Sequence, residues 1–191
     1  MIYRAKTFYR GDVATNYDKE RFLTLKGRVY DWFEKRSVEK ALFYLPKKYN
    51  ILDIPCGTGR ITEHLRNKGY EVSGADISVD MLKEASNKTD INYYLRDITQ
   101  LEFPRGLFQV ITCVRLMGHL PMSEKIRALR CMKRTAQFLV ITFYMRKKPI
   151  DHWHPVSPLQ LTELLHWCNL KIINKYPVCP GWSDGVTYLL T

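Results

Sequence analysis

Residues 51–60 read Ile-Leu-Asp-Ile-Pro-Cys-Gly-Thr-Gly-Arg, and this segment decides the fold class. It begins as a short apolar run, which is typical of a buried strand, and it ends in a glycine turn before a stretch with helical spacing. Gly57 and Gly59 let the backbone approach a ligand closely, because glycine has no Cβ. The helix that follows offers free N–H groups to a carboxylate or a phosphate. Asp53 is placed to accept from an ammonium group. This strand–turn–helix unit predicts a ligand-binding turn.

The same alternation continues along the rest of the chain. Apolar runs predict strands, and helical spacing predicts helices between them. Residues 177–184 are too few for a helical crossover, so the last strand must pair antiparallel with its predecessor. We therefore predict an α/β fold, a doubly wound, mostly parallel sheet with helices on both faces. The predicted strands are 49–54, 71–75, 91–95, 107–114, 138–144, 170–176 and 185–190; the predicted helices are 60–68, 78–87, 123–135 and 158–168, with a weak helical turn at 99–103 and one or two helices within 12–45.

Serine residues mark the predicted helix starts, with Ser78, Ser123 and Ser157 as N-caps. In the helix at 123–135, apolar residues recur at helical spacing. Its basic residues, Lys125 among them, are predicted on the other faces.

The chain has 191 residues, which fits one domain: a helical cap at 1–45 and a core at 46–191. Its 30 Lys and Arg residues against 19 Asp and Glu residues give a formal charge of +11. The excess is concentrated in 1–50 and 124–148. It predicts either an ordinary solvent-facing basic surface or an anion-binding face, and it does not identify the substrate.

The five cysteines form no Cys-x-x-Cys pair, which argues against a disulfide framework and a zinc site. Residues 1–6 lack the apolar run of a signal peptide. The longest apolar run, 138–145, is far below the ~20 residues of a membrane span. We therefore expect a soluble, cytoplasmic protein that holds no metal.

Acidic residues follow the second and third predicted strands. Asp76 is placed to accept from both ribose hydroxyls of a nucleoside. Asp97 could accept from an adenine amino group while Ile98 packs on the ring. Residue 62 is Thr, where a dinucleotide fingerprint requires a small residue, and the chain has no P-loop.

The chain here resembles the class I S-adenosylmethionine (SAM)-dependent methyltransferases, whose first motif reads like residues 52–60. The match continues through Gly74-Ala75-Asp76-Ile77-Ser78, Met81-Leu82, Asp97-Ile98, 108–111 and His119-Leu120, and 14–18 with Arg21 resemble the family's first helix. It covers roughly 12–191. The family's fold is a Rossmann-like seven-stranded sheet whose last strand is antiparallel.

The resemblance implies SAM as cofactor and assigns residues to its parts. The glycine loop with Asp53 would line the methionine half, Asp76 would hold the ribose, and Tyr17 with Arg21 would close over the cofactor. Pro55 stands where many members have glycine, as is familiar in the Pro-Cys-Gly-Thr-Gly subgroup. The full predicted cofactor set is Tyr17, Arg21, Asp53, Pro55, Cys56, Gly57, Thr58, Gly59, Asp76, Ile77, Met81, Asp97, Ile98 and Arg115.

His119 is the candidate general base, because an imidazole titrates near pH ~6.5, although it could also merely pack in its loop. Arg115 could contact the cofactor or an anionic acceptor, or be an ordinary surface arginine. His152 and His154 are candidate substrate contacts. The aromatic residues near the N-terminus, Tyr3, Phe8 and Tyr9, could form a lid or simply pack.

The leading hypothesis is methyl transfer to an O or N atom of a small or medium-sized acceptor, which could be anionic. A basic surface leaves open methylation of RNA or protein, although no Asn-Pro-Pro-Tyr-like motif follows the fourth strand. A non-catalytic SAM-binding partner subunit is the third hypothesis. The oligomeric state is open.

Overall fold

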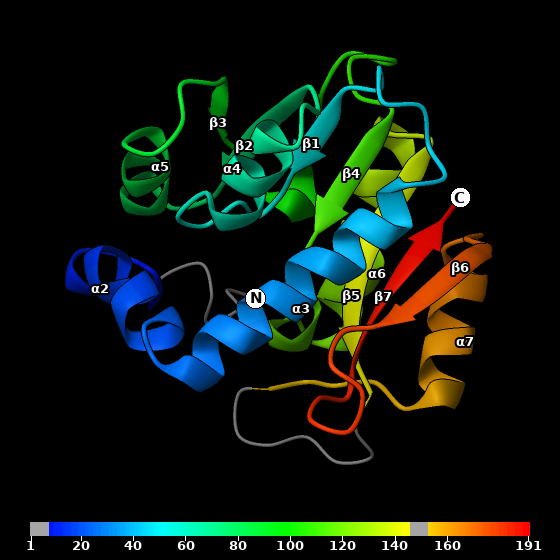
Figure 1. The fold of residues 1–191 in the computed structure, drawn as a ribbon. Helices are drawn as coiled ribbons and strands as arrows, with labels where there is room; N and C mark the ends of the chain where they lie inside the picture. The colour runs from blue at the N-terminus through cyan, green and yellow to red at the C-terminus, as the bar shows by residue number, and fades with distance from the viewer. Residues whose placement is uncertain (1–7, 146–152) are drawn as a thin grey trace.

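A computed structural model of the chain describes residues 8–145 and 153–191, and its core is one seven-stranded sheet (Figure 1). The strand order is β3-β2-β1-β4-β5-β7-β6. The strands are β1 (Ile51–Asp53), β2 (Val72–Asp76), β3 (Tyr93–Leu95), β4 (Val110–Cys113), β5 (Phe138–Tyr144), β6 (Ile172–Pro177) and β7 (Gly185–Leu190). The helices are α2 (Asp12–Phe22), α3 (Leu25–Leu42), α4 (Arg60–Asn67), α5 (Val79–Ser86), α6 (Met122–Thr135) and α7 (Pro158–Trp167), with short 3-10 turns η1 (Ile98–Gln100) and η2 (Met117–His119).

Strands β1 to β5 run parallel, and β7 lies antiparallel between β5 and β6. The order reverses at β1, which pairs with β2 on one side and β4 on the other. Ligands of doubly wound sheets bind outside the carboxyl ends of the strands at such a point. The predicted fold class is therefore confirmed, including the antiparallel last pair.

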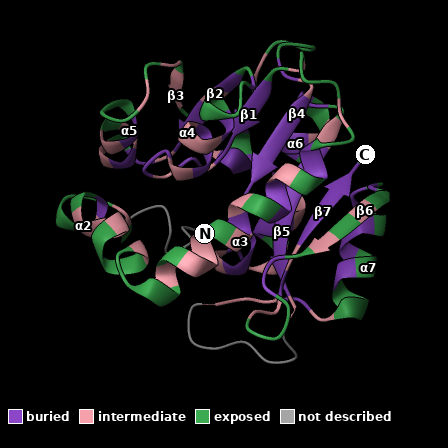
Figure 2. Ribbon diagram, viewed as in Figure 1, coloured by how far each residue is buried: buried purple, intermediate pink, exposed green. Residues whose placement is uncertain are grey.

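Two apolar layers cover the two faces of the sheet because successive strand side chains point to opposite sides. In β1, Ile51 packs with α3 and α4, whereas Leu52 packs with the cluster that contains α6 and α7. Val110 and Ile111 of β4 divide in the same way. Figure 1 shows α3 in front of the sheet and α6 and α7 behind it. The central strands are buried along their length, and α2 is largely exposed (Figure 2).

The predicted caps at Ser78 and Ser157 are confirmed, and Ser157 forms a capping box with Gln160. The predicted cap at Ser123 is wrong. Helix α6 begins one residue earlier, with Pro121 in extended backbone as its N-cap. A proline fits this point because its fixed φ is compatible with the last residue before a helix.

The position predicted for Lys125 is also wrong, because its side chain is only 2% exposed. Its Nζ donates to the carbonyl oxygens of Leu120 and His154 (2.7 Å to the latter), which replace water as partners. The remaining cost of burial lowers the pKa of Lys125 to about 8. This lysine joins the segment before α6 to the segment that follows β5.

None of the helices in the described ranges combines the length and the apolar character that crossing a bilayer requires.

Candidate active site

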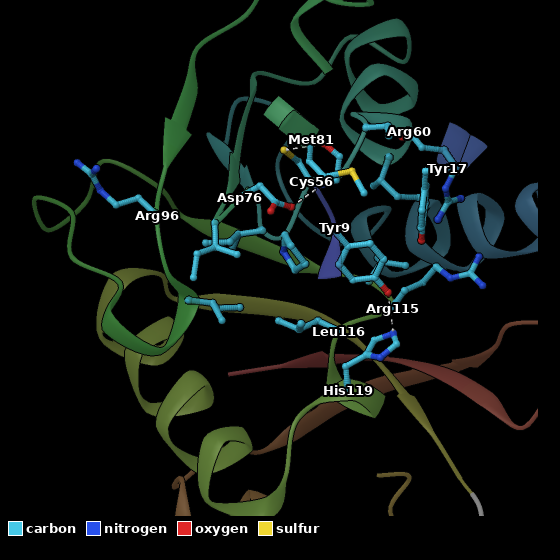
Figure 3. Close-up of a pocket in the computed structure, with 18 residues that line it drawn as sticks. Tyr9, Tyr17, Cys56, Arg60, Asp76, Met81, Arg96, Arg115, Leu116 and His119 are labelled. Atoms are coloured by element: carbon cyan, nitrogen blue, oxygen red, sulfur yellow. Dashed lines mark hydrogen bonds between the residues drawn. The ribbon is translucent and has the colours of Figure 1, made fainter. Parts of the chain in front are cut away.

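A cleft lies at the carboxyl ends of β1, β2 and β4, where the strand order reverses (Figure 3). The space within it, open solvent at the mouth included, is about 820 Å³, which is in the range of small-molecule sites. Its lining residues are Tyr9, Tyr17, Ile54, Pro55, Cys56, Gly57, Thr58, Arg60, Ile61, Asp76, Ile77, Met81, Arg96, Ile98, Val114, Arg115, Leu116 and His119.

The glycine loop is held to the end of β2 by Asp76. Asp76 Oδ2 accepts from the Gly57 N–H (2.9 Å), and its Oδ1 accepts from the Ser78 N–H (2.9 Å). The carboxyl group is 5% exposed, and burial raises its pKa although these backbone donors oppose the shift. The Ile77 backbone donor also opposes the shift, and the carboxyl group still keeps capacity for a further donor.

Gly57 and Gly59 both have positive φ, at 55° and 79°, but they meet different surroundings. A Cβ on Gly57 would meet open space. A Cβ on Gly59 would lie 3.0 Å from the Cβ of Ala85 on α5. Gly59 is therefore required for its left-handed backbone and for the packing of α4 against α5, and it does not line the cleft.

Asp53 lies beneath the loop and is fully buried. Its two oxygens accept from the hydroxyls of Thr62 (2.6 Å) and Thr112 (2.7 Å). Burial raises its pKa to about 6, although both hydroxyls act in the opposite direction. Asp53 therefore lies behind the wall of the cleft and does not line it.

The wall near α5 is apolar, with Ile77, Met81 and Ile98 along it. Asp97 lies next to this wall but outside the lining, and it caps η1 by accepting from both the N–H (2.9 Å) and the hydroxyl (2.7 Å) of Thr99. Such a wall suits a flat apolar ligand group.

The segment before α2 crosses the cleft. The Ser78 hydroxyl donates to the Tyr9 carbonyl, and the Gly11 N–H donates to Asp80 Oδ2 (2.8 Å). Helix α2 adds a third connection, since the Thr58 hydroxyl donates to Asp18 Oδ1 (2.7 Å). Figure 3 shows the ring of Tyr9 between Asp76 and His119. The N-terminal segment thus forms one wall of the cleft.

His119 lies at the end of η2, opposite Asp76. Its Nε2 is 3.5 Å from the Tyr9 hydroxyl, and its ring meets Trp153 edge-on at 4.7 Å. A Cβ on Gly118 would lie 2.4 Å from the same indole ring, so glycine is needed for the close approach. The His154 N–H donates to the Gly118 carbonyl (2.6 Å), which fixes this contact.

Arg60 and Arg115 form the wall of the cleft next to Tyr17, and both lie near the buried carboxylate of Glu34. Glu34 on α3 is 0% exposed, and its Oε2 accepts from Arg60 (2.5 Å) and lies 3.7 Å from Arg115. Arg60 also pairs with Asp31. Burial disfavours the charge on Arg115, but Glu34 outweighs it and raises the pKa of this residue. Arg115 itself has a φ of 64°, which is uncommon outside glycine.

The structure brings most of the predicted site residues into one cleft. Those that line it are Tyr17, Pro55, Cys56, Gly57, Thr58, Asp76, Ile77, Met81, Ile98, Arg115 and His119. Arg21 lines a neighbouring cavity instead, with its guanidinium 5.2 Å from the centre of the Tyr17 ring. His154 does not line the cleft, although its backbone N–H donates to the Gly118 carbonyl, and His152 lies outside the described residues.

Sequence reasoning missed six lining residues: Ile54, Arg60, Ile61, Arg96, Val114 and Leu116. Ile54 lies within the first motif, Arg60 directly follows the glycine turn, and Arg96, Val114 and Leu116 adjoin Asp97 or Arg115, so their positions were signals that could have identified them. Ile61 carries no signal of its own. Among the described residues, no group of three or more His, Cys, Asp or Glu side chains is arranged to hold a metal ion.

Comparison with known proteins decides the family. Residues 51–137 match the family described as "Methyltransferase domain". This segment is a class I SAM-dependent methyltransferase domain. The finding confirms the resemblance inferred from the motifs.

Two curated relatives resemble the chain over part of their length. The ubiquinone biosynthesis O-methyltransferase of Coxiella burnetii (strain Dugway 5J108-111) is 28% identical over 129 residues, which are 58% of this chain and 55% of the relative. The dTDP-3-amino-3,6-dideoxy-alpha-D-glucopyranose N,N-dimethyltransferase of Streptomyces fradiae is 31% identical over 124 residues, which are 63% and 47%. The chain thus spans about half the length of these relatives.

The fold also matches solved structures. Magnesium protoporphyrin IX methyltransferase from Synechocystis PCC 6803 with bound SAH, the demethylated form of SAM, superposes with a TM-score of 0.77. The two share 15% sequence identity, and the match covers 95% of each chain. At that identity the likeness concerns the fold.

The methyltransferase cleft has features that fit SAM. It contains the Asp76 carboxylate, the apolar wall near α5 and open space next to Gly57. A nucleoside needs acceptors for its hydroxyls and a flat apolar surface for its base, and a methionine tail needs N–H donors for its carboxylate. The first turn of α4 supplies such donors.

Proposed function

We propose that this chain transfers the methyl group of SAM to an O or N atom of a small or medium-sized acceptor. The observation that supports the proposal is a single cleft with Asp76 on one side and His119 on the other. Asp76 suits the nucleoside of the cofactor, and His119 suits the proton of the acceptor. The two walls therefore divide cofactor binding from acceptor chemistry.

In this proposal, Asp76 accepts from the ribose hydroxyls, and Ile77, Met81 and Ile98 enclose the adenine. Gly57 and the first turn of α4 take the methionine end. Bound SAM supplies a methyl group activated by its sulfonium, so the protein mainly orients the acceptor in line with it. Tyr9 and Tyr17 cover the cleft and exclude water from the reacting groups.

His119 is the proposed general base. Its Nε2 would take the proton from the acceptor oxygen or nitrogen as the new bond to carbon forms. The Trp153 ring and the Gly118 backbone hold η2 in place, and Lys125 fixes the residue after it. A base held in this way needs little reorganisation during the reaction.

A small acceptor is favoured over RNA or protein for two reasons. The two relatives named above are an O-methyltransferase of ubiquinone biosynthesis and an N,N-dimethyltransferase of a nucleotide sugar. The cleft is also covered by the segment that carries Tyr9, which leaves less room for a macromolecule. We further propose that the chain acts as one domain, since its strands form one sheet. We also propose a reducing compartment such as the cytoplasm, since all five cysteines are buried and free.

Calorimetry with SAM and SAH, followed by a labelled-methyl transfer assay, tests the proposal. Both ligands are expected to bind, and label is expected in a small-molecule fraction of a cell extract. Transfer of label to RNA or protein would show that the acceptor is a macromolecule and would refute the small-molecule acceptor. Binding without any transfer would favour a non-catalytic partner subunit, and the absence of binding would refute the cofactor site.

A further inference from the structure

A second cavity adjoins the cleft on the far side of Arg115, which lines both. Its other walls come from the end of α2, the start of α3 and the loop between β6 and β7. The lining residues are Arg21, Phe22, Thr24, Lys26, Gly27, Tyr30, Arg115 and Trp182. Three are cationic, none is acidic, and three are aromatic.

The guanidinium of Arg115 lies near the rings of Phe22 and Tyr30, and its central carbon is 5.3 Å and 5.4 Å from their respective centres. Its Nη1 is buried and, within the described part of the chain, has no hydrogen-bond partner. The nearest carboxylate oxygen, on Glu34, is 3.7 Å away, which is beyond hydrogen-bond distance. A buried donor without a partner is costly, and an acceptor supplied by a ligand would remove that cost.

The acidic residues nearby are already engaged. Glu34 accepts from Arg60 and from the Tyr144 hydroxyl (3.3 Å), and Asp31 accepts from Arg60 and lies 2.8 Å from Lys35 Nζ. They therefore do not neutralise Arg21 and Lys26, which are exposed at the mouth of the second cavity. The cavity is left with an excess of positive charge and ring surfaces beside it.

We propose that the second cavity binds the carboxylate of the methyl acceptor, an organic acid with a flat apolar body. A guanidinium offers a planar pair of donors that matches a carboxylate, and the rings of Tyr30 and Trp182 provide the surface for the body of the acid. Since Arg115 faces both spaces, an acid bound there reaches toward His119. This proposal rests on the proposed function, because it names the acceptor of the same methyl transfer.

The test uses benzoate as the probe, titrated into the full chain with and without saturating SAH. Neutral benzamide is the isosteric control. Benzoate is expected to bind at least about tenfold more tightly than benzamide, because charge complementarity decides the site. The Lys26→Met variant is expected to weaken benzoate binding about fivefold and leave SAH binding unchanged. Lys19→Met, an exposed lysine on α2 that lines neither space, is the matched control and is expected to match the wild type.

Four outcomes would overturn the proposal. Benzoate and benzamide could bind equally tightly, or the Lys26 and Lys19 variants could lose benzoate affinity equally. Inorganic phosphate could bind as tightly as benzoate, or Lys26→Met could lose as much affinity for SAH as for benzoate. The last would make the cavity a cofactor subsite. Failure of the proposed function has a different signature, because SAH would then not bind to the wild type while benzoate alone still reports on the cavity.

Discussion

Replacing Asp76 by alanine tests the cofactor site at the residue that joins the glycine loop to the end of β2. The wild-type carboxylate accepts from the Gly57 and Ser78 N–H groups, each at 2.9 Å. In the proposed complex it also accepts from two ribose hydroxyls. The variant removes all four interactions.

The expected magnitude follows from these contacts. A hydrogen bond to a charged group contributes about 1.5–3 kcal/mol, but water partly replaces the lost partner when the ligand is free. We therefore expect SAH binding to weaken by about 1.5–3 kcal/mol in total, which is roughly a 10- to 150-fold rise in Kd. Folding stability should change less, because the lost backbone contacts are offset by removal of a buried carboxylate whose pKa burial raises.

Isothermal titration calorimetry with SAH measures the affinity, and near-ultraviolet circular dichroism first establishes that each variant is folded. Asp90→Ala is the matched control, since it removes an exposed carboxylate in the turn before β3 that lies outside the cleft. It should bind SAH within about twofold of the wild type. A folded Asp76→Ala protein with unchanged SAH affinity would refute the assignment of the ribose to this residue.

Three further predictions concern His119, Asp53 and Lys125. Once an acceptor is identified, His119→Ala should lower kcat about 100-fold or more and abolish the rising limb of the pH–rate profile, while SAH affinity stays unchanged. An unaltered kcat would contradict the role of His119 as general base. Burial raises the pKa of Asp53 to about 6, above the value in the unfolded chain. The contribution of this carboxyl to the free energy of unfolding is therefore fully present below about pH 4 and is lost as the pH rises through 6. In urea denaturation, the unfolding free energy of Asp53→Asn should not show this decrease with pH. At pH 7 the variant should be more stable than the wild type by at most about 3 kcal/mol. A variant less stable than the wild type at pH 7 would show that the fold favours the ionised carboxylate. Burial lowers the pKa of Lys125 to about 8, so its contribution to stability rises with pH between about 8 and 10.5. The difference in unfolding free energy between wild type and Lys125→Met should grow over that range, and a constant difference would refute it.

The parts of the site that the sequence predicts are those formed by contiguous turns. The glycine loop follows β1, Asp76 is the last residue of β2 and Ile98 comes shortly after β3, and the parallel sheet brings these strand ends to the same edge. Their meeting therefore follows from strand order and requires no knowledge of side-chain packing. The same reasoning predicts all seven strands, with errors of a few residues at their ends.

Parts that depend on tertiary contacts were missed or wrongly placed. Lys125 occupies a polar position on a helix surface by pattern, but the carbonyl groups of Leu120, just before α6, and of His154, far along the chain, allow it to be buried. Gly59 is a ligand-facing glycine by motif, and its close packing beside Ala85 on α5 is a further reason for glycine that the motif did not predict. No local pattern contains this information, because each partner is set by how helices pack on the sheet.

The buried charges around Glu34 limit which residues of the site can vary. This fully buried carboxylate on α3 pairs with Arg60, at the start of α4, and lies beside Arg115, in the loop after β4. It thereby connects the cofactor loop with the residue that separates the two cavities. Removing one partner of such a buried pair leaves an uncompensated charge, so these residues can change only together. In contrast, Lys26 and Trp182 are exposed at the cavity mouth and lie outside this network. They can change without disturbing the buried charges. If the second cavity binds the acceptor as proposed, its mouth is therefore where acceptor selection can vary while the cofactor site is kept.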